Sequence, residues 1–258
     1  MKNKKSVIEK RRQNLIEILK SQKPYRTEIL AEKLNCSPIT IRRDVHVLLE
    51  DGKVECTRGL VKISSKLQEK KEQDIYERSR QLIAKRAAQM IDDGDIVFMN
   101  AGRTTRALLI EANGKSITVI TNNLMVLDVP LSPNTSLMLT GGETSPYPGL
   151  HGSFVINSLS KVVAQKVFLG VNGITAEYGL TTSISSQTSV MEHMLKSCNG
   201  EKIIIADSSK IGKNLSFNAA GLGEVTCLIT DNLADPEEIN RIRSIGVRVE
   251  IVNIEEDE

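Results

Sequence analysis

Three segments in the first fifty residues place apolar side chains at the spacing of an amphipathic helix. We expect helices over residues 9–20, 27–34 and 38–49, with Thr27 as the cap of the second. On the third segment Ile41, Val45 and Leu48 recur at helical spacing, so they are expected to pack inward.

The third segment is bounded by residues that start and stop helices. Ser37 can accept a hydrogen bond from a free backbone N–H, and Pro38 fits the first helical turn. Gly52 is well placed to end the helix. Residues 53–63 then form two short extended runs about a turn at residues 57–59, which predicts a β-ribbon. Three helices followed by a ribbon predict a winged helix-turn-helix domain over residues 1–63.

The pattern changes after residue 63. Residues 64–80 are rich in alternating charges, and we interpret them as a linker that is helical in part. Over residues 81–258 short apolar runs alternate with helical patterns, which predicts a Rossmann-like α/β domain with a largely parallel sheet covered on both faces. The expected strands are 96–99, 117–120, 136–139, 166–169, 202–206, 225–229 and 247–252, and the expected helices are 81–91, 105–111, 154–162, 189–198 and 236–244.

Composition narrows the class of protein. The chain is 40% hydrophobic and 26% charged, as is typical of a globular protein. No apolar run approaches the ~20 residues that span a bilayer, and no apolar stretch of a secretory signal follows the basic start. The four cysteines form no C-x-x-C pair and the chain has three histidines, so we expect no metal, no cofactor and a cytoplasmic location.

Charge is unevenly distributed along the chain. Residues 1–63 hold 15 Lys and Arg against 8 Asp and Glu, whereas the remainder holds 19 against 24. The first balance is +7 and the second −5, consistent with the net charge of +2. A basic head on an acidic body is typical of a nucleic-acid-binding module joined to another domain, although a solvated basic surface would give the same count.

The third predicted helix has an outward face suited to the major groove of DNA. An arginine there can make paired hydrogen bonds to guanine, while other polar and basic side chains bind phosphates. A charged exposed helix face is the commoner meaning of such a run, but the capped start and the following ribbon favour DNA. The candidate residues are Ser37, Ile39, Thr40, Arg42, Arg43 and His46, with Arg11, Arg12 and Arg58 as contacts to the DNA backbone.

Polar and glycine-rich residues recur where predicted strands end. Residues 100–105, Asn-Ala-Gly-Arg-Thr-Thr, lie between a strand and a helix, where backbone N–H groups attract an anion. The carboxyl edge of an open α/β sheet is where ligands bind, so we expect a pocket there.

At these residues the chain resembles a known family. Residues 37–44, Ser-Pro-Ile-Thr-Ile-Arg-Arg-Asp, resemble the S-x-x-T-I-R-R-D recognition helix of the DeoR family of bacterial transcriptional regulators, and residues 100–105 resemble its D-x-G-x-T-T segment. One departure is in the ribbon, where Gly59-Leu60 stands in place of a Gly-Gly pair.

The resemblance implies a sensor domain that is similar in fold to ribose-5-phosphate isomerases and CoA transferases, and a repressor that a phosphorylated sugar or related effector releases from operator DNA. It places the phosphate at residues 102–105 with Lys210 as counter-charge, and sugar hydroxyls at polar residues of neighbouring strand ends. The expected effector-binding residues are Asn100, Gly102, Arg103, Thr104, Thr105, Thr121, Asn122, Gly141, Gly142, Gly152, Asn172, Gln187, Asp207 and Lys210.

Two departures bear on the pocket. Asn100 stands where the family has Asp, and Gln187 begins a run where the family has Glu-Ala-x-x-Lys. Either the effector differs from the usual ones, or the pocket binds no ligand of that kind.

Three functions are open at this point. The first is a regulator of a carbohydrate operon, expected to act as a homodimer or homotetramer because one winged helix has a small footprint on DNA. The second is a sugar-phosphate isomerase or CoA-transferase-like enzyme with a DNA-binding head, in which Asp207 or Glu143 would have to supply the base. The third is an architectural DNA-binding protein without an effector.

Overall fold

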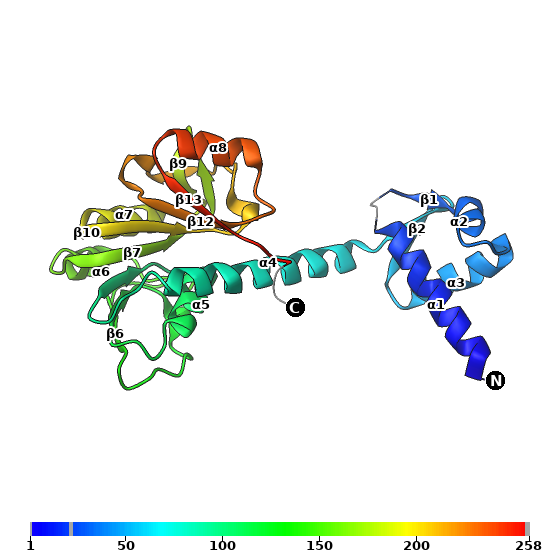
Figure 1. Cartoon of the computed structure of the whole chain (residues 1–258), viewed down its shortest axis with the longest axis horizontal. Coiled ribbons are helices and arrows are strands. Elements are labelled where there is room, and N and C mark those ends of the chain that lie inside the picture. The colour runs from blue at the N-terminus through cyan, green and yellow to red at the C-terminus, as the bar shows by residue number, and fades with distance from the viewer. Residues whose placement is uncertain (1, 21–22, 256–258) are drawn as a thin grey trace. The chain divides into compact units, whose positions relative to one another are not determined.

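A computed structural model describes residues 2–20 and 23–255 of the chain. The chain divides into two compact units, residues 1–75 and residues 76–258, and each is described here by itself. Figure 1 shows both in the colours of the sequence, from blue at the N-terminus to red at the C-terminus.

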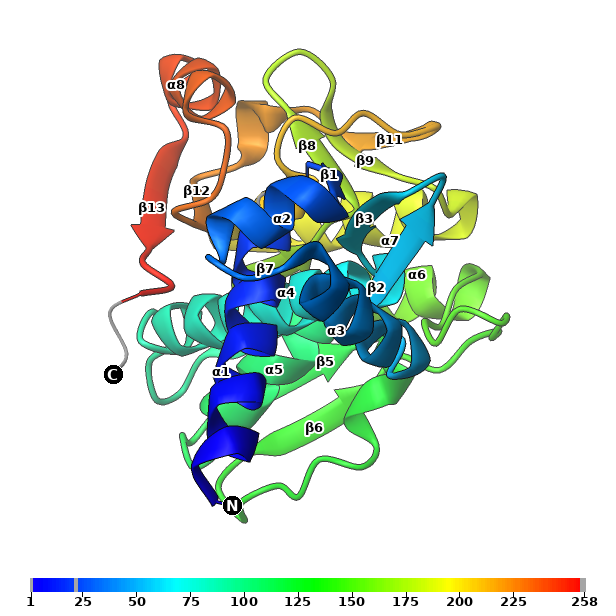
Figure 2. The same ribbon diagram turned by 90° about the vertical axis from the view of Figure 1, so that its right-hand side faces the viewer.

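The first unit is a winged helix-turn-helix, as predicted. Figure 2 faces this unit and shows its helices beside a small antiparallel sheet of strand order β1-β3-β2. Its core consists of apolar side chains from all three helices and the two ribbon strands. The elements are α1 (Lys2–Leu19), β1 (Tyr25–Arg26), α2 (Thr27–Lys33), α3 (Pro38–Glu50), β2 (Val54–Thr57) and β3 (Leu60–Ile63).

Some of the helix ends lie at the capping residues that the sequence predicted, and others do not. The Ser37 hydroxyl accepts from the backbone N–H of Thr40 at 3.2 Å, which caps α3 as expected. The cap of α2 was predicted wrongly, because the extended residue before the helix is Arg26 and Thr27 is its first helical residue. Helix α1 begins earlier than residue 9, and the two-residue strand β1 had no signal in the apolar pattern.

The ribbon closes through a tight turn at Arg58 and Gly59. Both residues have a left-handed backbone, with φ of 52° and 78°, and Thr57 pairs with Leu60 across the ladder. Two successive residues of positive φ match the twist of antiparallel strands, which explains the glycine at the second position.

Helix α4 (Ser65–Ala88) covers nearly all of the segment expected to be a linker, and it continues into the helix expected at 81–91. The division between the two compact units falls within this helix, after Ile75.

The second unit is built on a seven-stranded sheet in which every pairing is parallel. All seven expected strands are present, with bounds that differ by a few residues. The strand order is β13-β12-β10-β7-β4-β5-β6, and the strands are β4 (Ile96–Met99), β5 (Thr118–Thr121), β6 (Ser136–Leu139), β7 (Ala164–Gly170), β10 (Cys198–Ile205), β12 (Cys227–Asp231) and β13 (Arg248–Val252).

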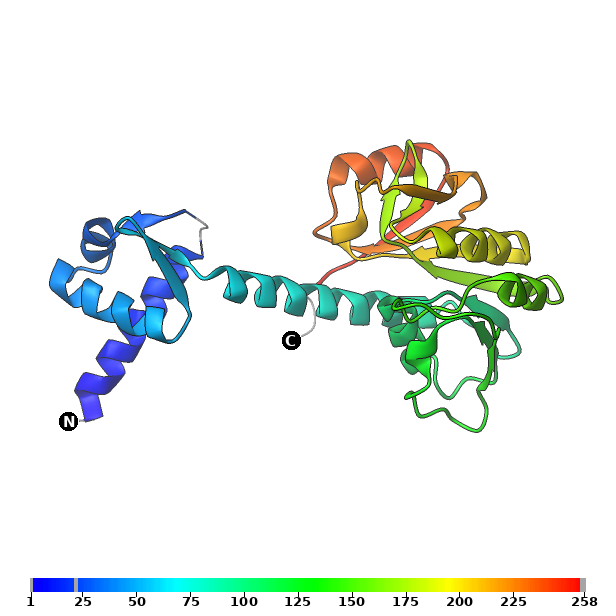
Figure 3. The ribbon, with the colours of Figure 1, turned by 180° about the vertical axis from the view of Figure 1, so that it is seen from behind.

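Helices cover both faces of this sheet, as predicted. On one face α4 and α5 pack against side chains such as Phe168, and on the other α6, α7 and α8 pack against its neighbours Val167 and Leu169. Figures 1 and 3 show the unit from opposite sides. The helices are α5 (Arg103–Glu111), α6 (Ser153–Leu159), α7 (Ser185–Lys196) and α8 (Pro236–Ser244), with short 3₁₀ turns at Leu124–Val126, Ser208–Lys210 and Leu222–Glu224.

A second, antiparallel sheet of three strands was not predicted. It consists of β8 (Gly173–Thr175), β9 (Gly179–Thr182) and β11 (Phe217–Ala220), in the order β11-β9-β8. A side chain at Gly179 would lie 2.3 Å from the carbonyl oxygen of Ala220, so the close approach of two backbones requires glycine there.

Candidate functional site

Helix α3 presents an exposed face opposite its buried one. Ile41, Val45 and Leu48 are buried, whereas Ile39 is 66% exposed. The exposed residues border a shallow hollow of about 720 Å³ on the surface of the unit. Its lining is Arg12, Ile39, Arg42, Arg43, His46, Val47 and Glu50.

Two of the arginines predicted to contact DNA, Arg11 and Arg12, are paired with Asp44. This carboxylate is only 2% exposed, and it accepts from Nε of Arg11 at 2.6 Å and from Nε of Arg12 at 2.9 Å. The hydrogen bond that Arg11 donates to Asp44 raises the pKa of Arg11. The two arginines are therefore clamps between α1 and α3, with only the remainder of each guanidinium available to a phosphate. Asp44, the aspartate of the Arg-Arg-Asp run, is the sequence feature from which these ion pairs could have been predicted.

Other charged residues of the face are paired loosely. Arg42 lies 3.0 Å from Glu28, and the ring of His46 lies 3.4 Å from Glu50, with all four side chains mostly exposed. Exposed pairs of this kind contribute little to stability and exchange readily for a stronger partner. A second hollow of about 450 Å³ brings Arg58 of the ribbon turn and Arg26 together with Arg42 and His46.

A pocket of about 290 Å³ lies at the carboxyl ends of β4, β7 and β10 in the second unit. This volume is at the lower end of the range of small-molecule sites. The pocket brings together six of the predicted effector residues: Gly102, Arg103, Thr104, Asn172, Asp207 and Lys210.

The start of helix α5 forms one wall. Gly102 is its N-cap and supplies no side-chain acceptor, so the first backbone N–H groups of the helix have no side-chain cap. A helix N-terminus carries partial positive charge, which attracts anions.

Cations outnumber carboxylates along the lining, which contains Arg80, Arg103 and Lys210 but only Asp207 with negative charge. Burial lowers the pKa of Lys210, and the charge of Asp207 opposes that effect. Arg106, the other arginine of this helix, is held by Asp128 at 2.9 Å and lines no part of the pocket.

Asn100 is not part of the pocket lining, but it is bonded to Gly170, which is. Its Nδ2 donates to the carbonyl oxygen of Gly170, and its Oδ1 accepts from the N–H of the same residue, both at 2.8 Å. Thr105 donates to the carbonyl oxygen of Asn100 at 2.7 Å, and Thr121 accepts from the N–H of Asn123 at 3.1 Å. These three predicted residues connect strand ends and turns.

Asn122 and Gln187 are buried against each other. Nδ2 of Asn122 donates to Oε1 of Gln187 at 3.1 Å and to the carbonyl oxygen of Leu150 at 2.7 Å. The Oδ1 of Asn122 and the Nε2 of Gln187 have no hydrogen-bond partner within residues 2–20 and 23–255. Neither residue lines the pocket, nor do the three glycines expected there, which have positive φ in the segment after β6: Gly141, Gly142 and Gly152.

Several residues of the lining escaped the sequence pattern. Tyr147 donates from its hydroxyl to the carbonyl oxygen of Ala101 at 2.7 Å, and burial raises its pKa. Arg80 lay inside the expected linker, where nothing in the local sequence distinguishes it from a solvated charge. The others are Ala101, Met125, Pro148, Gly170 and Val171.

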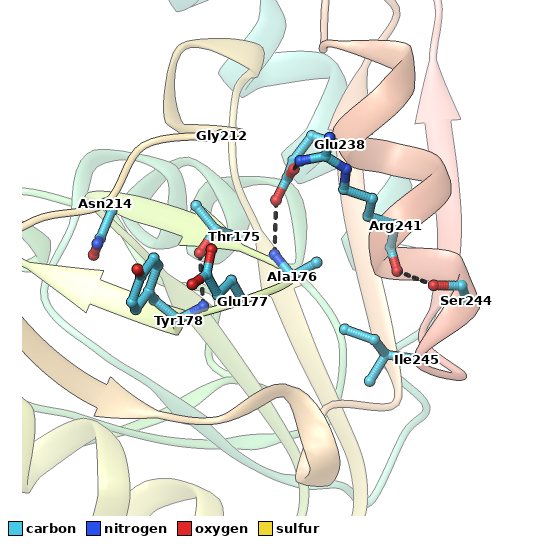
Figure 4. A pocket seen from close by; sticks show the side chains of 10 residues that line it. All are labelled: Thr175, Ala176, Glu177, Tyr178, Gly212, Asn214, Glu238, Arg241, Ser244 and Ile245. Atoms are coloured by element: carbon cyan, nitrogen blue, oxygen red, sulfur yellow. Dashed lines mark hydrogen bonds and ion pairs between the residues drawn. The ribbon is translucent and has the colours of Figure 1, made fainter.

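A further hollow, of about 570 Å³, lies between α8 and the β8–β9 hairpin (Figure 4). Its buried carboxylate, Glu238, accepts from the backbone N–H of Ala176 at 2.7 Å and lies 3.5 Å from Arg241 (Figure 4). No predicted effector residue borders it.

Within residues 2–20 and 23–255, no helix combines the length and the apolar character that a membrane crossing requires.

Two family models match the chain. The model described as the DeoR C terminal sensor domain matches residues 76–232, and that described as the DeoR-like helix-turn-helix domain matches residues 11–66.

Two relatives match over nearly their whole length. The chain is 33% identical to a lactose phosphotransferase system repressor of Staphylococcus epidermidis, over 85% of this chain and 90% of the relative. It is 31% identical to the HTH-type transcriptional repressor GlcR of Bacillus subtilis, over 95% of each chain.

Among solved structures, ribose 5-phosphate isomerase A of Methanocaldococcus jannaschii matches with a TM-score of 0.38 and 14% identity, over 56% of this chain and 55% of that chain. The eIF2B delta subunit of Chaetomium thermophilum matches with a TM-score of 0.43 and 22% identity, over 58% of this chain and 54% of that chain. The fold described above rests on the strand order of the chain itself.

Proposed function

The chain belongs to the DeoR family of transcriptional regulators, and from this premise we propose its mode of action. It represses an operon of sugar metabolism by binding operator DNA through α3, and a phosphorylated sugar bound in the 290 Å³ pocket releases it. The proposal places the protein in the cytoplasm, because its operator DNA lies there.

The exposed face of α3 supports the DNA half of the proposal. Arg42, Arg43 and Ile39 are exposed, and Arg42 has only an exposed carboxylate as partner. Ser37 and Thr40 are at the start of the helix, where recognition helices contact base edges and phosphates. Arg58 at the ribbon turn would contact the DNA backbone.

The composition of the pocket is the observation that carries the effector half. Three cations and a helix N-terminus face one carboxylate in a space suited to a small metabolite. Such a site favours a phosphate, and Asn172 and Thr104 add hydrogen-bonding groups for sugar hydroxyls. The names of the relatives, a lactose system repressor and a repressor GlcR, support a sugar operon.

The residues that line the pocket also argue against the alternative function, a sugar-phosphate isomerase with a DNA-binding head. Aldose–ketose isomerisation needs a carboxylate base at the substrate carbon. The carboxylate of the lining, Asp207, is 3% exposed, faces Arg80 and accepts from the N–H of Ser209 at 3.1 Å. Glu143, the other candidate base, does not line the pocket.

The test is a titration of the protein into labelled DNA from upstream of its own gene, followed by fluorescence anisotropy at two salt concentrations. The titration is repeated with a panel of sugar phosphates. We expect salt-sensitive binding that exceeds binding to scrambled DNA and is released by one phosphate. The stoichiometry at saturation is expected to be two or four chains per operator, because paired half-sites need a homodimer or homotetramer.

Other outcomes separate the alternatives. Specific binding that no ligand affects would indicate an architectural protein or an altered pocket. An absence of DNA binding, together with ketose formation from ribose 5-phosphate, would overturn the proposal in favour of the isomerase.

A further inference from the structure

Arg80 places a buried cation on the wall of the pocket. Its side chain is 6% exposed. Nη2 lies 2.5 Å from Glu77 and Nη1 lies 3.4 Å from Oδ2 of Asp207. Nε is buried and has no hydrogen-bond partner among the residues that the structure describes. A guanidinium has five N–H donors, and buried donors are normally satisfied. Each Nη group makes one of the two contacts and carries a second N–H, so Arg80, which lines the pocket, can accommodate a further acceptor there.

The partner that Arg80 has in the pocket is a weak one. Charge-assisted N–H···O bonds are normally about 2.7–2.9 Å long, and the contact with Asp207 is 3.4 Å. The other oxygen of Asp207, Oδ1, accepts from the N–H and the hydroxyl of Ser209. A phosphate, which carries more charge and offers more oxygens, would be the better partner for a guanidinium fork.

The neighbouring residue of α4, Ser79, is joined to the segment that bears two of the other pocket charges, Asp207 and Lys210. The hydroxyl of Ser79 donates to Oδ2 of Asp231, which also accepts from the N–H of Ser208 at 2.7 Å. Asp207 and Lys210 flank Ser208 in the turn after β10. A shift of this turn or of Arg80 therefore acts directly on α4.

We infer that a bound phosphate replaces Asp207 as the partner of Arg80, and that this exchange is the step by which helix α4 responds to the ligand. The inference rests on the proposed function and adds the means of regulation to it. A ligand shifts a conformational equilibrium only through contacts that differ between the two states, and the Arg80 exchange is such a difference.

Helix α4 begins in the first unit, which contains the winged helix-turn-helix and is here called the DNA-binding unit. Its first residue, Ser65, donates from its backbone N–H and its hydroxyl to Oε1 of Glu55, at 2.8 and 2.9 Å. Glu55 belongs to strand β2 of the ribbon. The same helix thus bonds the ribbon at its first residue, bonds Asp231 through Ser79 and lines the pocket with Arg80.

The experiment compares the full-length wild type with Arg80→Gln, Arg80→Lys and Asp207→Asn. Arg86→Gln is the matched control, because Arg86 is on the same helix but pairs with Glu250 at 2.7 Å and does not line the pocket. Calorimetry measures the affinity for inorganic phosphate and for glucose 6-phosphate. Anisotropy measures the affinity for operator DNA without ligand and at saturating ligand.

In the wild type, ligand is expected to weaken DNA binding by about 5- to 150-fold, the usual range of coupling between two sites. Arg80→Gln removes a charged hydrogen bond, so ligand affinity should fall roughly 10- to 100-fold. At saturation the ratio of the two DNA affinities should approach one. Asp207→Asn should bind phosphate more tightly than the wild type, and Arg86→Gln should behave as the wild type.

A variant Arg80→Gln that is released from DNA with the wild-type ratio would overturn the inference and leave the proposed function intact. A wild type that binds operator DNA but neither phosphate would overturn the effector half of the proposed function, and the inference with it. If Arg80→Gln does not fold, Arg80→Lys decides, because it keeps the charge without the fork and is expected to lose the coupling as well.

Discussion

At the scale of single residues, the asparagines near the pocket hold strand ends together. Asn100 satisfies both the N–H and the carbonyl group of Gly170, which a side chain with one donor and one acceptor can do. Asparagine here therefore has a structural reason, although the family pattern has aspartate. A carboxylate could accept from the N–H of Gly170, but it would face the carbonyl oxygen without a proton to donate.

We expect Asn100→Asp to lower the free energy of unfolding by about 1–3 kcal/mol, because it leaves a buried carbonyl group unsatisfied beside a charge. Chemical denaturation at neutral pH measures the change. Asn134→Asp adds the same charge at an exposed position and should alter stability by less than about 0.5 kcal/mol. Unchanged stability of Asn100→Asp together with altered phosphate affinity would instead place Asn100 in contact with the effector.

At the scale of elements, the strands with a strong apolar run were predicted correctly, and strands with a weak one were missed. The central strands β4, β5, β7, β10 and β12 each contain a buried apolar run, whereas the edge strands β6 and β13 are exposed or half-buried. Strand β11 begins Phe-Asn and has two exposed residues, and its pairing with β9 depends on contacts distant in sequence. Its existence had no local signal.

The pocket was likewise predicted in part, and the reason is again the difference between local and long-range signals. Glycines, threonines and charges at strand ends predicted the edge of the sheet and six lining residues, because carboxyl ends of parallel strands meet there. Which side chains point into the space was not predictable. Asn100 and Asn122 turn toward backbone groups, while Arg80 enters from a helix whose charged sequence resembles a linker.

The junction of β2 and α4 is expected to weaken in acid. Hydrogen bonds from the Ser65 N–H, Lys62 and the Ser65 hydroxyl lower the pKa of Glu55 from 4.5 to about 2. A depressed folded-state pKa stabilises the fold above the ordinary value, and the contribution is lost as pH falls from about 4.5 toward about 2. Glu55→Gln should therefore lower Tm at pH 7 but have progressively less effect over this window.

Thermal unfolding of both proteins from pH 7 to pH 2, followed by circular dichroism, measures this difference. Ser65→Ala removes one of the donors and should show an intermediate difference. A difference between wild type and Glu55→Gln that is constant across the window would contradict the assignment.

At the scale of the whole molecule, the charge of the chain separates into a basic first part and an acidic remainder. Residues 1–63 carry a balance of +7 and the rest −5. Binding to DNA is then expected to depend strongly on salt, because each phosphate that is neutralised releases counterions.

Two arginines of the DNA-binding unit should respond differently to substitution. Arg43→Ala is expected to weaken binding to the operator by about 1–3 kcal/mol while leaving scrambled DNA nearly unaffected, as for a residue that reads a base edge. Arg58→Ala should weaken binding to both DNAs alike and reduce the slope of log K against log salt by about 1. Anisotropy at four salt concentrations separates the two. Identical behaviour of the two variants would exclude a base-reading role for Arg43.

The unbroken course of α4 constrains how this sequence can change over generations. Residues 66–79 lie within this helix, and a proline inside a helix removes a backbone hydrogen bond and clashes with the preceding turn, at a cost of about 3 kcal/mol. Relatives should therefore vary in the composition of residues 66–74 but lack proline there.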